Sequence, residues 1–333
     1  MTAVGNRDSV RGHQGQEADI WIVVLNYRTP GLAIDCLGSI EAQVRALIAR
    51  VVVVDNASGD GSLAQLGEAI GRHGWDSWAS LLPLAHNGGY AAGNNAAVRL
   101  AMAQTPPPRY VLILNPDTVV RPDAIGALCR FMDATPRAGI AGSRLLSPTG
   151  EVECSAHRAP SVWGELDNAG RLGVLTQLLS RHIVSPPPRD TPHRCDWVSG
   201  SSMIIRREVF EAIGLLDERY FLYFEEVDFC TRARRAGWEV WSIPQSVILH
   251  LEGSATGIRR PGARRAGYWF DSRRRYFLKH HGLAGLLAAD LFWAVGRLAF
   301  LLRKWLGPTR VYDADPAYLE RDLLWGDLRA MIT

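Results

Sequence analysis

The chain has 333 residues, of which 47% are hydrophobic and 21% are charged. This length and apolar content can build a large buried core, which excludes a disordered chain. A formal net charge of +3 argues against general nucleic-acid binding, so we expect no nucleic-acid partner. Five cysteines without a CxxC pair give no sign of a disulfide framework or a zinc site, and they fit a reducing cytoplasm.

Residues 1–18 are polar and Gly-rich, and we expect a disordered leader there rather than a signal peptide. From Asp19 onward, strand-like and helix-like segments alternate. The strand-like segments are 20–26, 51–55, 81–84 and 110–114, and the helix-like segments are 31–44, 62–73, 91–104 and 122–132. This βαβ rhythm predicts an α/β domain over residues 19–282, with a mostly parallel sheet that helices cover on both faces.

The apolar strand predicted at 110–114 is followed at once by Asn115, Pro116 and Asp117. Ligands of open α/β sheets bind beyond the carboxyl ends of the strands. A carboxylate there can hold a divalent cation against a diphosphate. Asp117 could equally cap the helix that follows, and this stretch alone leaves both interpretations open.

Two further strand ends carry polar groups. Asp55 begins a polar loop, where its carboxylate can accept hydrogen bonds from a ribose or a base. The chain has no GxGxxG motif after this strand, which argues against a dinucleotide. Residues 86–95 form a Gly-rich start to a helix, where the backbone can approach an anionic ligand.

Five segments taken in order resemble glycosyltransferase family 2, a family of inverting enzymes with a GT-A fold, whose sheet is Rossmann-like and binds nucleotides. They are VVLNYRTP, VVVVDNASGDGS, NGGYAAGNN, LILNPDT and WVSGSSMIIRREVFEAIGLLDERYFLYFEEVDFCTRARRAGW, within residues 20–282. Inside the family, the chain is most similar to bacterial rhamnosyltransferases that act on lipid-linked saccharides. Some of those enzymes add L-rhamnose to N-acetylglucosaminyl-diphospho-polyprenol.

The resemblance implies a binding site for a nucleotide-sugar donor. It would be formed by Asn26, Tyr27, Asp55, Asn87, Gly88, Asn94, Asn115 and Asp117. Asp117 would bind Mg²⁺ or Mn²⁺, and His250 would complete the metal or diphosphate site. Asn115 stands where the family commonly has the first acid of its DxD motif. This replacement lowers the negative charge and implies a weaker metal dependence.

The resemblance also implies a catalytic base in the segment from Phe224 to Phe229. Inverting transfer needs a carboxylate that takes the proton from the attacking hydroxyl. By alignment we assign this role to Glu226, where the family more often has Asp. Glu225 and Asp228 are competing catalytic residues that could also orient the acceptor. All three acids could instead stabilise a helix N-terminus.

On the acceptor side, the resemblance points to Trp197 and Gly200 in one loop. Independently of the resemblance, Arg259 opens a later Arg-rich segment and is a further candidate for substrate binding. Trp197 could stack on a sugar ring or pack as a core aromatic. Seven arginines between 259 and 275 suit a diphosphate, and some of them could face water or anionic lipid. Residues 159–194 interrupt the sheet pattern, and we hypothesise that they form a mobile lid over the acceptor.

Residues 283–333 are predicted to form a C-terminal amphipathic helical extension. The apolar run from Leu283 to Leu306 is interrupted by Asp290, Arg297 and Lys304, which are seven residues apart and share one stripe of a helix. Such a helix would lie in a membrane interface. Docking on the catalytic domain or on a second subunit, as in a homodimer, is an alternative, and spanning the membrane is another. Residues 311–333 predict a short amphipathic helix.

We therefore expect an inverting glycosyltransferase of cell-envelope glycan biosynthesis. Its expected donor is dTDP-L-rhamnose, and its expected acceptor is a lipid-linked saccharide or polysaccharide at the inner face of the cytoplasmic membrane. An alternative is the same chemistry with UDP-galactofuranose or UDP-N-acetylglucosamine. A non-catalytic nucleotide-sugar-binding or carbohydrate-binding protein is a second alternative, because Asn115 and Glu226 depart from the commonest pattern.

Overall fold

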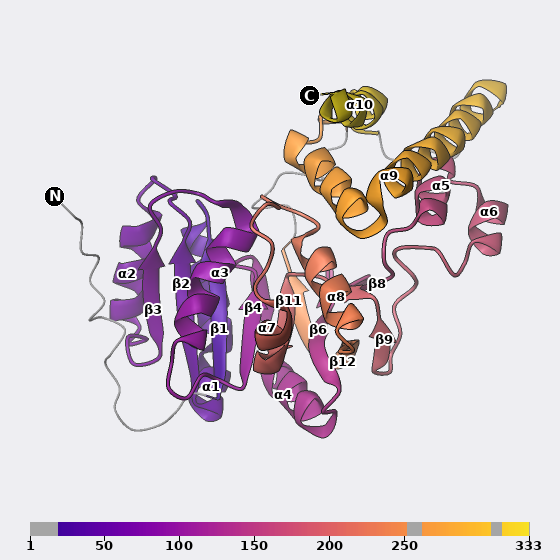
Figure 1. The fold of residues 1–333 in the computed structure, drawn as a ribbon. Coiled ribbons are helices and arrows are strands. Elements are labelled where there is room, and N and C mark those ends of the chain that lie inside the picture. The colour runs from indigo at the N-terminus through magenta and orange to yellow at the C-terminus, as the bar shows by residue number, and fades with distance from the viewer. Residues whose placement is uncertain (1–18, 252–261, 308–314, 333) are drawn as a thin grey trace.

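The computed structural model describes residues 19–251, 262–307 and 315–332. Its centre is a large sheet with the strand order β3-β2-β1-β4-β11-β6-β12-β5 (Figure 1). These strands are β1 (Ile20–Asn26), β2 (Ala49–Asp55), β3 (Ala79–Pro83), β4 (Tyr110–Leu114), β5 (Thr118–Val120), β6 (Ala138–Leu146), β11 (Ser202–Arg206) and β12 (Glu239–His250). Two short strands extend the sheet: β7 (Val152–Glu153) on β6 and β9 (His193–Cys195) on β12. A separate small sheet pairs β8 (Ala156–His157) with β10 (Trp197–Val198).

The strands β3, β2, β1 and β4 are all parallel, so their carboxyl ends meet at one edge of the sheet. The register pairs Asn26 with Asp55 at the ends of β1 and β2. The strand β11 runs antiparallel between β4 and β6, and β12 is parallel to β6. The predicted α/β architecture with a mostly parallel sheet is thus confirmed, with β11, β5, β7 and β9 as antiparallel members.

Helices cover both faces of this sheet, because each strand buries alternate side chains on opposite sides. In β1, Ile22 packs on one core and Val23 on the other. The first core holds α1 (Pro30–Leu47), α2 (Ser62–Arg72) and α4 (Ala124–Ala134). The second core holds α3 (Gly89–Met102), α7 (Arg207–Ile213) and α8 (Glu225–Arg235).

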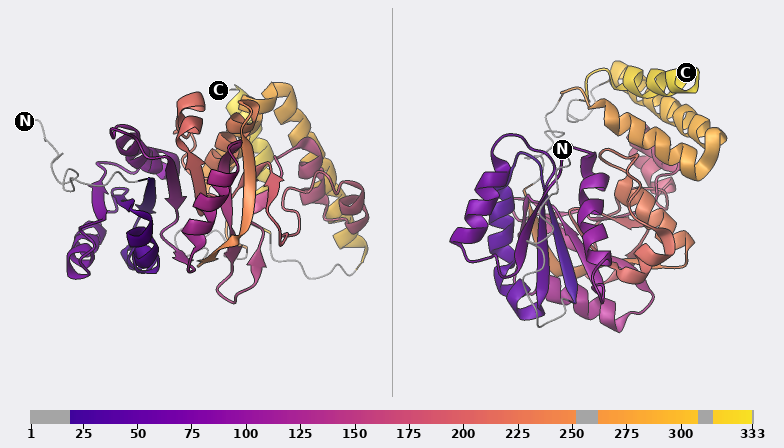
Figure 2. Two further views of the ribbon diagram at one scale, coloured as in Figure 1. Left: turned by 90° about the horizontal axis from the view of Figure 1, so that it is seen from below. Right: turned by 60° about the vertical axis from the view of Figure 1, so that its left-hand side comes forward.

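The C-terminal residues form a further layer beside the sheet, which we call the C-terminal layer and define as residues 262–307 and 315–332. It contains α9 (Gly267–Leu306), a π-helical turn (Arg321–Trp325) and α10 (Gly326–Ile332). Figures 1 and 2 show α9 and α10 outside the body of the sheet. Gly282 has a φ of 70° and divides α9 into two halves. Only glycine adopts this conformation without steric cost, so the chain turns there.

The segment 159–194 packs against this layer. It contains α5 (Val162–Gly170) and α6 (Gly173–Leu178), and α5 crosses the second half of α9 closely. A Cβ atom on Gly296 would lie 2.5 Å from the carbonyl oxygen of Leu166. The glycine therefore permits this close crossing of the two helices.

The three members of the polar stripe predicted at 283–306 do not share one environment. Asp290 and Arg297 are only 9% and 7% exposed, whereas Lys304 lies at the surface. The two buried residues form ion pairs with other parts of the chain, because an unpaired charge inside a protein is costly. The helix is therefore docked through its charged side. The expected leader at 1–18 lies outside the described residues.

Candidate active site

A cavity of about 600 Å³ opens at the carboxyl edge of the sheet. It gathers side chains from the ends of β1 and β4, from the loop before α3, from the start of α8 and from the end of β12. Tyr268 at the start of α9 completes its wall. The predicted residues in its lining are Tyr27, Asn87, Asn115, Asp117, Gly200, Glu225, Glu226 and His250.

Asp117 and His250 lie next to each other in this cavity. The pairing of β12 with β5 places His250 opposite Thr118, one residue after Asp117. The Nε2 atom of His250 is 3.4 Å from Oδ1 of Asp117, and Asp117 is only 4% exposed. Two residues that are distant in the sequence thus form one carboxylate and imidazole pair.

Side-chain oxygens without hydrogen-bond partners lie at this end of β4. Within the part of the chain that the structure describes, Oδ1 of Asn115 and Oδ1 of Asp117 are buried without a hydrogen-bond partner. Nε2 of His250 approaches Asp117 closely but does not form an aligned hydrogen bond with it. Buried polar atoms normally find partners, so these oxygens are suited to an additional ligand.

The described residues hold no group of three or more His, Cys, Asp or Glu side chains in metal-binding geometry. A divalent cation in this cavity would therefore take few ligands from the protein. Mg²⁺ commonly binds in this way, through one or two carboxylates plus substrate phosphates and water. Asp117, His250 and Asn115 fit such a site, provided that a diphosphate supplies the remaining oxygens.

Two neighbouring carboxylates, Glu225 and Glu226, face the cavity from the start of α8. The two preceding residues, Tyr223 and Phe224, have φ angles of 71° and 68°, which are rare for residues other than glycine. Such backbone strain often occurs at functional sites. Here it turns the chain so that α8 begins at the cavity wall.

The pKa values of both glutamates are raised. Burial is the largest cause, and it raises the pKa of Glu226 to about 7. Burial and the nearby Glu226 also raise the pKa of Glu225 well above its ordinary value. Oε2 of each glutamate lacks a hydrogen-bond partner among the described residues. A carboxylate with a pKa near neutrality is well matched to proton transfer.

Asp228 lies in a different environment, outside the lining of the cavity. It is fully buried and lies 2.7 Å from Nζ of Lys279. It also accepts hydrogen bonds from Nε2 of His280 at 2.7 Å and from Nε of Arg232 at 2.8 Å. Burial opposes its charge, but these contacts outweigh burial and lower the pKa of Asp228. The structure thus places Asp228 as an anchor between α8 and α9 rather than beside a substrate.

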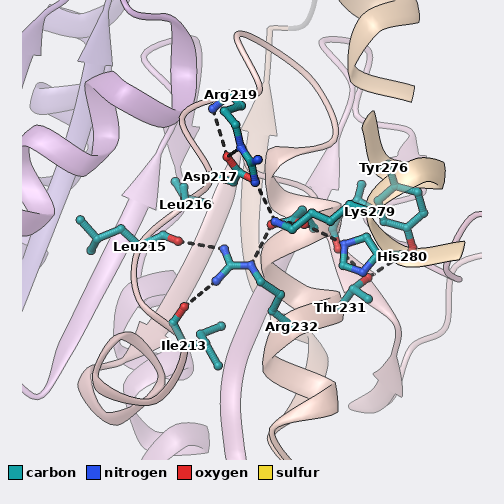
Figure 3. Close-up of polar contacts among 12 residues, drawn as sticks. Ile213, Leu215, Leu216, Asp217, Arg219, Thr231, Arg232, Tyr276, Lys279 and His280 are labelled. Carbon is teal, nitrogen blue, oxygen red and sulfur yellow. Dashed lines mark hydrogen bonds and ion pairs between the residues drawn. The ribbon is translucent and has the colours of Figure 1, made fainter. Parts of the chain in front are cut away.

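The partners of Asp228 extend this anchor. Arg232 donates to the carbonyl oxygens of Ile213 at 2.7 Å and Leu215 at 2.8 Å (Figure 3). Lys279 donates to Asp217 at 2.8 Å, which places Asp217 in this network as well. The start of α8 is therefore held by α9 on one side and by the loop after α7 on the other.

The predicted nucleotide residues divide into two groups. Tyr27 and Asn87 line the cavity. Asn26 and Asp55 are buried behind it, where Nδ2 of Asn26 donates to Oδ1 of Asp55 at 2.9 Å. The hydroxyl of Ser58 donates to the same oxygen at 2.6 Å. Asn56, which the sequence did not single out, lines the cavity in their place.

The Gly-rich start of α3 is fixed against another loop. Gly89 has a φ of 86°, and a Cβ atom there would lie 2.1 Å from the carbonyl oxygen of Phe221. Asn87 supports this turn, since its Oδ1 accepts from Nδ2 of Asn56 and from the Gly89 amide, each at 2.9 Å. Gly88 and Asn94 do not line the cavity.

Of the two predicted acceptor residues that the structure describes, one lines the cavity and one does not. Gly200 lines the cavity, and its carbonyl oxygen accepts from the Tyr90 hydroxyl at 2.7 Å. Trp197 is not part of the lining. It stacks on His157 with ring centroids 4.0 Å apart, and its indole N–H donates to the carbonyl oxygen of Arg158. Arg259 lies outside the described residues.

The segment 159–194 contributes no residue to this cavity among those described. It is held instead by α9, where the Arg273 guanidinium donates to Glu165 at 2.9 Å. The predicted acceptor lid is therefore wrong for this structure. The lining instead includes four aromatic residues that sequence reasoning missed: Tyr90, Phe221, Tyr223 and Tyr268.

The comparison with known proteins agrees with this geometry. Residues 21–214 match the family model described as glycosyl transferase family 2. The chain belongs to glycosyltransferase family 2. It is 31% identical over 266 residues to an N-acetylglucosaminyl-diphospho-decaprenol L-rhamnosyltransferase of Mycobacterium tuberculosis, an alignment that covers 75% of this chain and 80% of that protein.

Two further similarities place this glycosyltransferase among its relatives. It is 22% identical over 236 residues to a dTDP-rhamnosyl transferase of Shigella flexneri, which covers 71% of this chain and 70% of that protein. Its structure matches a mannosyltransferase of Pyrobaculum calidifontis, solved with GDP-Man and Mn²⁺. That match has a TM-score of 0.54 at 16% identity and covers 96% of this chain and 81% of that one. It confirms the GT-A fold.

Proposed function

We propose that this glycosyltransferase transfers L-rhamnose from dTDP-L-rhamnose to a lipid-linked or polysaccharide acceptor with inversion at the anomeric carbon. The observation that carries the proposal is one cavity with a pair suited to a metal, Asp117 and His250, and a pair of carboxylates with raised pKa values, Glu225 and Glu226. The relatives named for rhamnosyl transfer support the choice of donor and its place in cell-envelope glycan biosynthesis.

On the donor side, Asp117, His250 and Asn115 would hold Mg²⁺ or Mn²⁺. When bound, the cation neutralises charge on the diphosphate leaving group. Tyr27, Asn56 and Asn87 line the same cavity and can contact the nucleoside. Asn26 and Asp55 support these residues from behind, since they brace the ends of β1 and β2.

On the acceptor side, we assign the general base to Glu226. The acceptor oxygen attacks the anomeric carbon, and the bond from this carbon to the diphosphate breaks. The hydroxyl proton moves to Glu226, and the nucleoside diphosphate leaves. Of the two glutamates, Glu226 is the less buried, so it is the one more accessible to an acceptor hydroxyl in the cavity. Glu225 is the more buried neighbour, and the charge of Glu226 helps to raise its pKa.

Release of nucleotide from a panel of sugar nucleotides tests the donor. The panel holds dTDP-rhamnose, UDP-galactofuranose and UDP-N-acetylglucosamine, with and without Mg²⁺ or Mn²⁺. The acceptor is a polyprenyl-diphosphate N-acetylglucosamine. We expect acceptor-dependent release of dTDP alone, and an α or β product whose configuration is opposite to that of the donor. Release of UDP would show that the donor is a UDP-sugar and not dTDP-L-rhamnose. A product that retains the configuration of the donor would overturn the inverting mechanism.

A further inference from the structure

The second half of α9, residues 283–306, exposes an apolar face. All exposed side chains from 283 to 302 are apolar, and we call them the outward face: Leu283, Ala284, Leu287, Leu291, Val295, Leu298, Leu301 and Leu302. Their spacing of three or four residues puts them on one side of the helix. At 1.5 Å per residue, the face is about 30 Å long.

Except for Lys304 at its end, the charged residues of this half of α9 point the other way. Arg273 donates to Asp290 at 2.8 Å, and Arg297 pairs with Asp315 at 2.8 Å. Arg303 donates to the carbonyl oxygen of Gly170 at 2.7 Å. A surface helix of a soluble protein normally buries its leucines and exposes its charges. Here the arrangement is reversed.

An apolar face of this length is unusual on a monomeric protein in water, and such patches mark contact surfaces. We propose that the outward face docks on the surface of a lipid bilayer with anionic headgroups. The inference rests in part on the proposed function, because a lipid-linked acceptor places the enzyme at a bilayer. Its test measures binding to lipid and not turnover.

The charge of the C-terminal layer favours an anionic surface. Residues 262–307 and 315–332 carry eleven Lys and Arg against six Asp and Glu, a net charge of +5. Residues 19–251 carry a net charge of −3. Basic residues beside an apolar helix face are attracted to anionic lipid. Lys304 and Trp305, both exposed, end the face with residue types that gather at membrane interfaces.

The same charge argues against a second copy as the occupant. Two chains docked through this face would bring together two layers of net charge +5, and this repulsion opposes a dimer. An anionic bilayer supplies both the apolar interior and the opposite charge. The structure therefore favours lipid over a partner subunit.

The helix would lie on the bilayer rather than cross it. By length and composition alone, α9 is long and apolar enough to cross a membrane. Spanning would break the ion pairs of Asp290 and Arg297, and it would leave both charges in hydrocarbon. It would also separate Gly296 from α5, which approaches too closely for a Cβ atom. Since Tyr268 at the start of α9 lines the cavity, surface docking holds the catalytic site beside the lipid.

Flotation with vesicles tests this proposal on the full chain. Vesicles of phosphatidylcholine alone are compared with vesicles containing phosphatidylglycerol. We expect the protein to float with the anionic vesicles. The double variant Leu291→Glu with Leu298→Glu should bind at least about tenfold more weakly, because each exposed leucine loses its contact with the acyl chains. Leu63→Glu, an exposed leucine on α2, is the matched control and should bind like the wild type.

Three results would overturn the proposal. The first is equal flotation of the double variant and the wild type. The second is a wild-type dimer in light scattering that the double variant abolishes, without any flotation, since the face would then join two subunits. The third is resistance of bound protein to alkaline carbonate extraction, which would indicate a membrane span. An unchanged melting temperature shows that the variants fold. Unchanged turnover of a lipid-free acceptor analogue shows that the proposed function does not depend on binding to the bilayer.

Discussion

At the scale of single residues, the cavity separates acids that look alike in the sequence. Glu225, Glu226 and Asp228 are near neighbours, yet only the two glutamates line the cavity. Asp228 is enclosed by basic groups from α8 and α9. The sequence predicts an acidic cluster at a helix start, but the partners Lys279 and His280 come from a helix about fifty residues further on. No pattern in the sequence near Asp228 predicts its contacts with Lys279 and His280.

The dependence of the rate on pH follows from the raised pKa of Glu226. A base accepts a proton only when it is ionised, so kcat/KM should rise with pH and level off above a midpoint near pH 7. Initial rates from about pH 5 to about pH 9 measure this, and the midpoint belongs to Glu225 and Glu226 as a pair. A rate that is flat across this range would remove Glu226 as the base.

Substitution of Asp117 tests the metal pair. Asp117→Asn keeps the size of the side chain but removes the charge that faces a cation. We expect the Mg²⁺ or Mn²⁺ concentration at half-maximal rate to rise about tenfold or more. Titration of the rate with metal is the measurement. Asp123→Asn, an exposed residue outside the cavity, is the control. If the metal concentration at half-maximal rate is unchanged in Asp117→Asn, Asp117 does not bind the cation.

At the scale of elements, the active site depends on close contacts between segments. Gly89→Ala would place a methyl group 2.1 Å from the carbonyl oxygen of Phe221, at a φ of 86° that alanine rarely adopts. We expect it to destabilise the fold by about 1–3 kcal/mol and to raise KM for the donor, because the loop before α3 lines the cavity. Denaturant unfolding and donor kinetics measure both effects.

The matched control is Gly31→Ala at the start of α1. A Cβ atom there meets nothing within 4 Å, and its φ is not in the positive range. This variant should leave both stability and KM close to wild type. Equal effects in the two variants would contradict the role of the Gly89 contact.

The anchor between α8 and α9 supports the catalytic glutamates from outside the cavity. Asp228→Asn would leave Lys279 and Arg232 without their buried carboxylate, and we expect a loss of stability of about 3–5 kcal/mol. Turnover should fall with KM for the donor nearly unchanged, because Asp228 does not line the cavity. Equilibrium unfolding and steady-state kinetics provide the two readouts. Full stability in this variant would show that the network contributes little.

At the scale of the whole molecule, the sequence predicted the site residues that lie at the ends of parallel strands. The ends of β1, β2 and β4 meet at one edge by necessity, so Tyr27 and Asp117 could be placed near one another in advance. Other walls come from packing between distant segments. Tyr268 reaches the cavity because the start of α9 packs its ring against Phe221 and Tyr223, far away in the sequence.

In the C-terminal layer, too, the sequence could not predict contacts between distant segments. Periodicity correctly put Asp290 and Arg297 on one side of a helix, but it could not tell which side faces the protein. Arg273, 1% exposed, decides this, because it pairs with Glu165, Asp290 and Asp327 from three other parts of the chain. A buried guanidinium needs such partners, and their convergence is a property of the tertiary structure.

The most direct test of the proposed mechanism is acceptor-dependent release of dTDP by the Glu226→Gln variant. Glutamine keeps the shape of the side chain but cannot take the proton. We predict that release falls by about 100-fold or more while dTDP-rhamnose binding, measured by calorimetry, stays within about twofold of wild type. Wild-type turnover in this variant would contradict the account, because the base would then lie elsewhere.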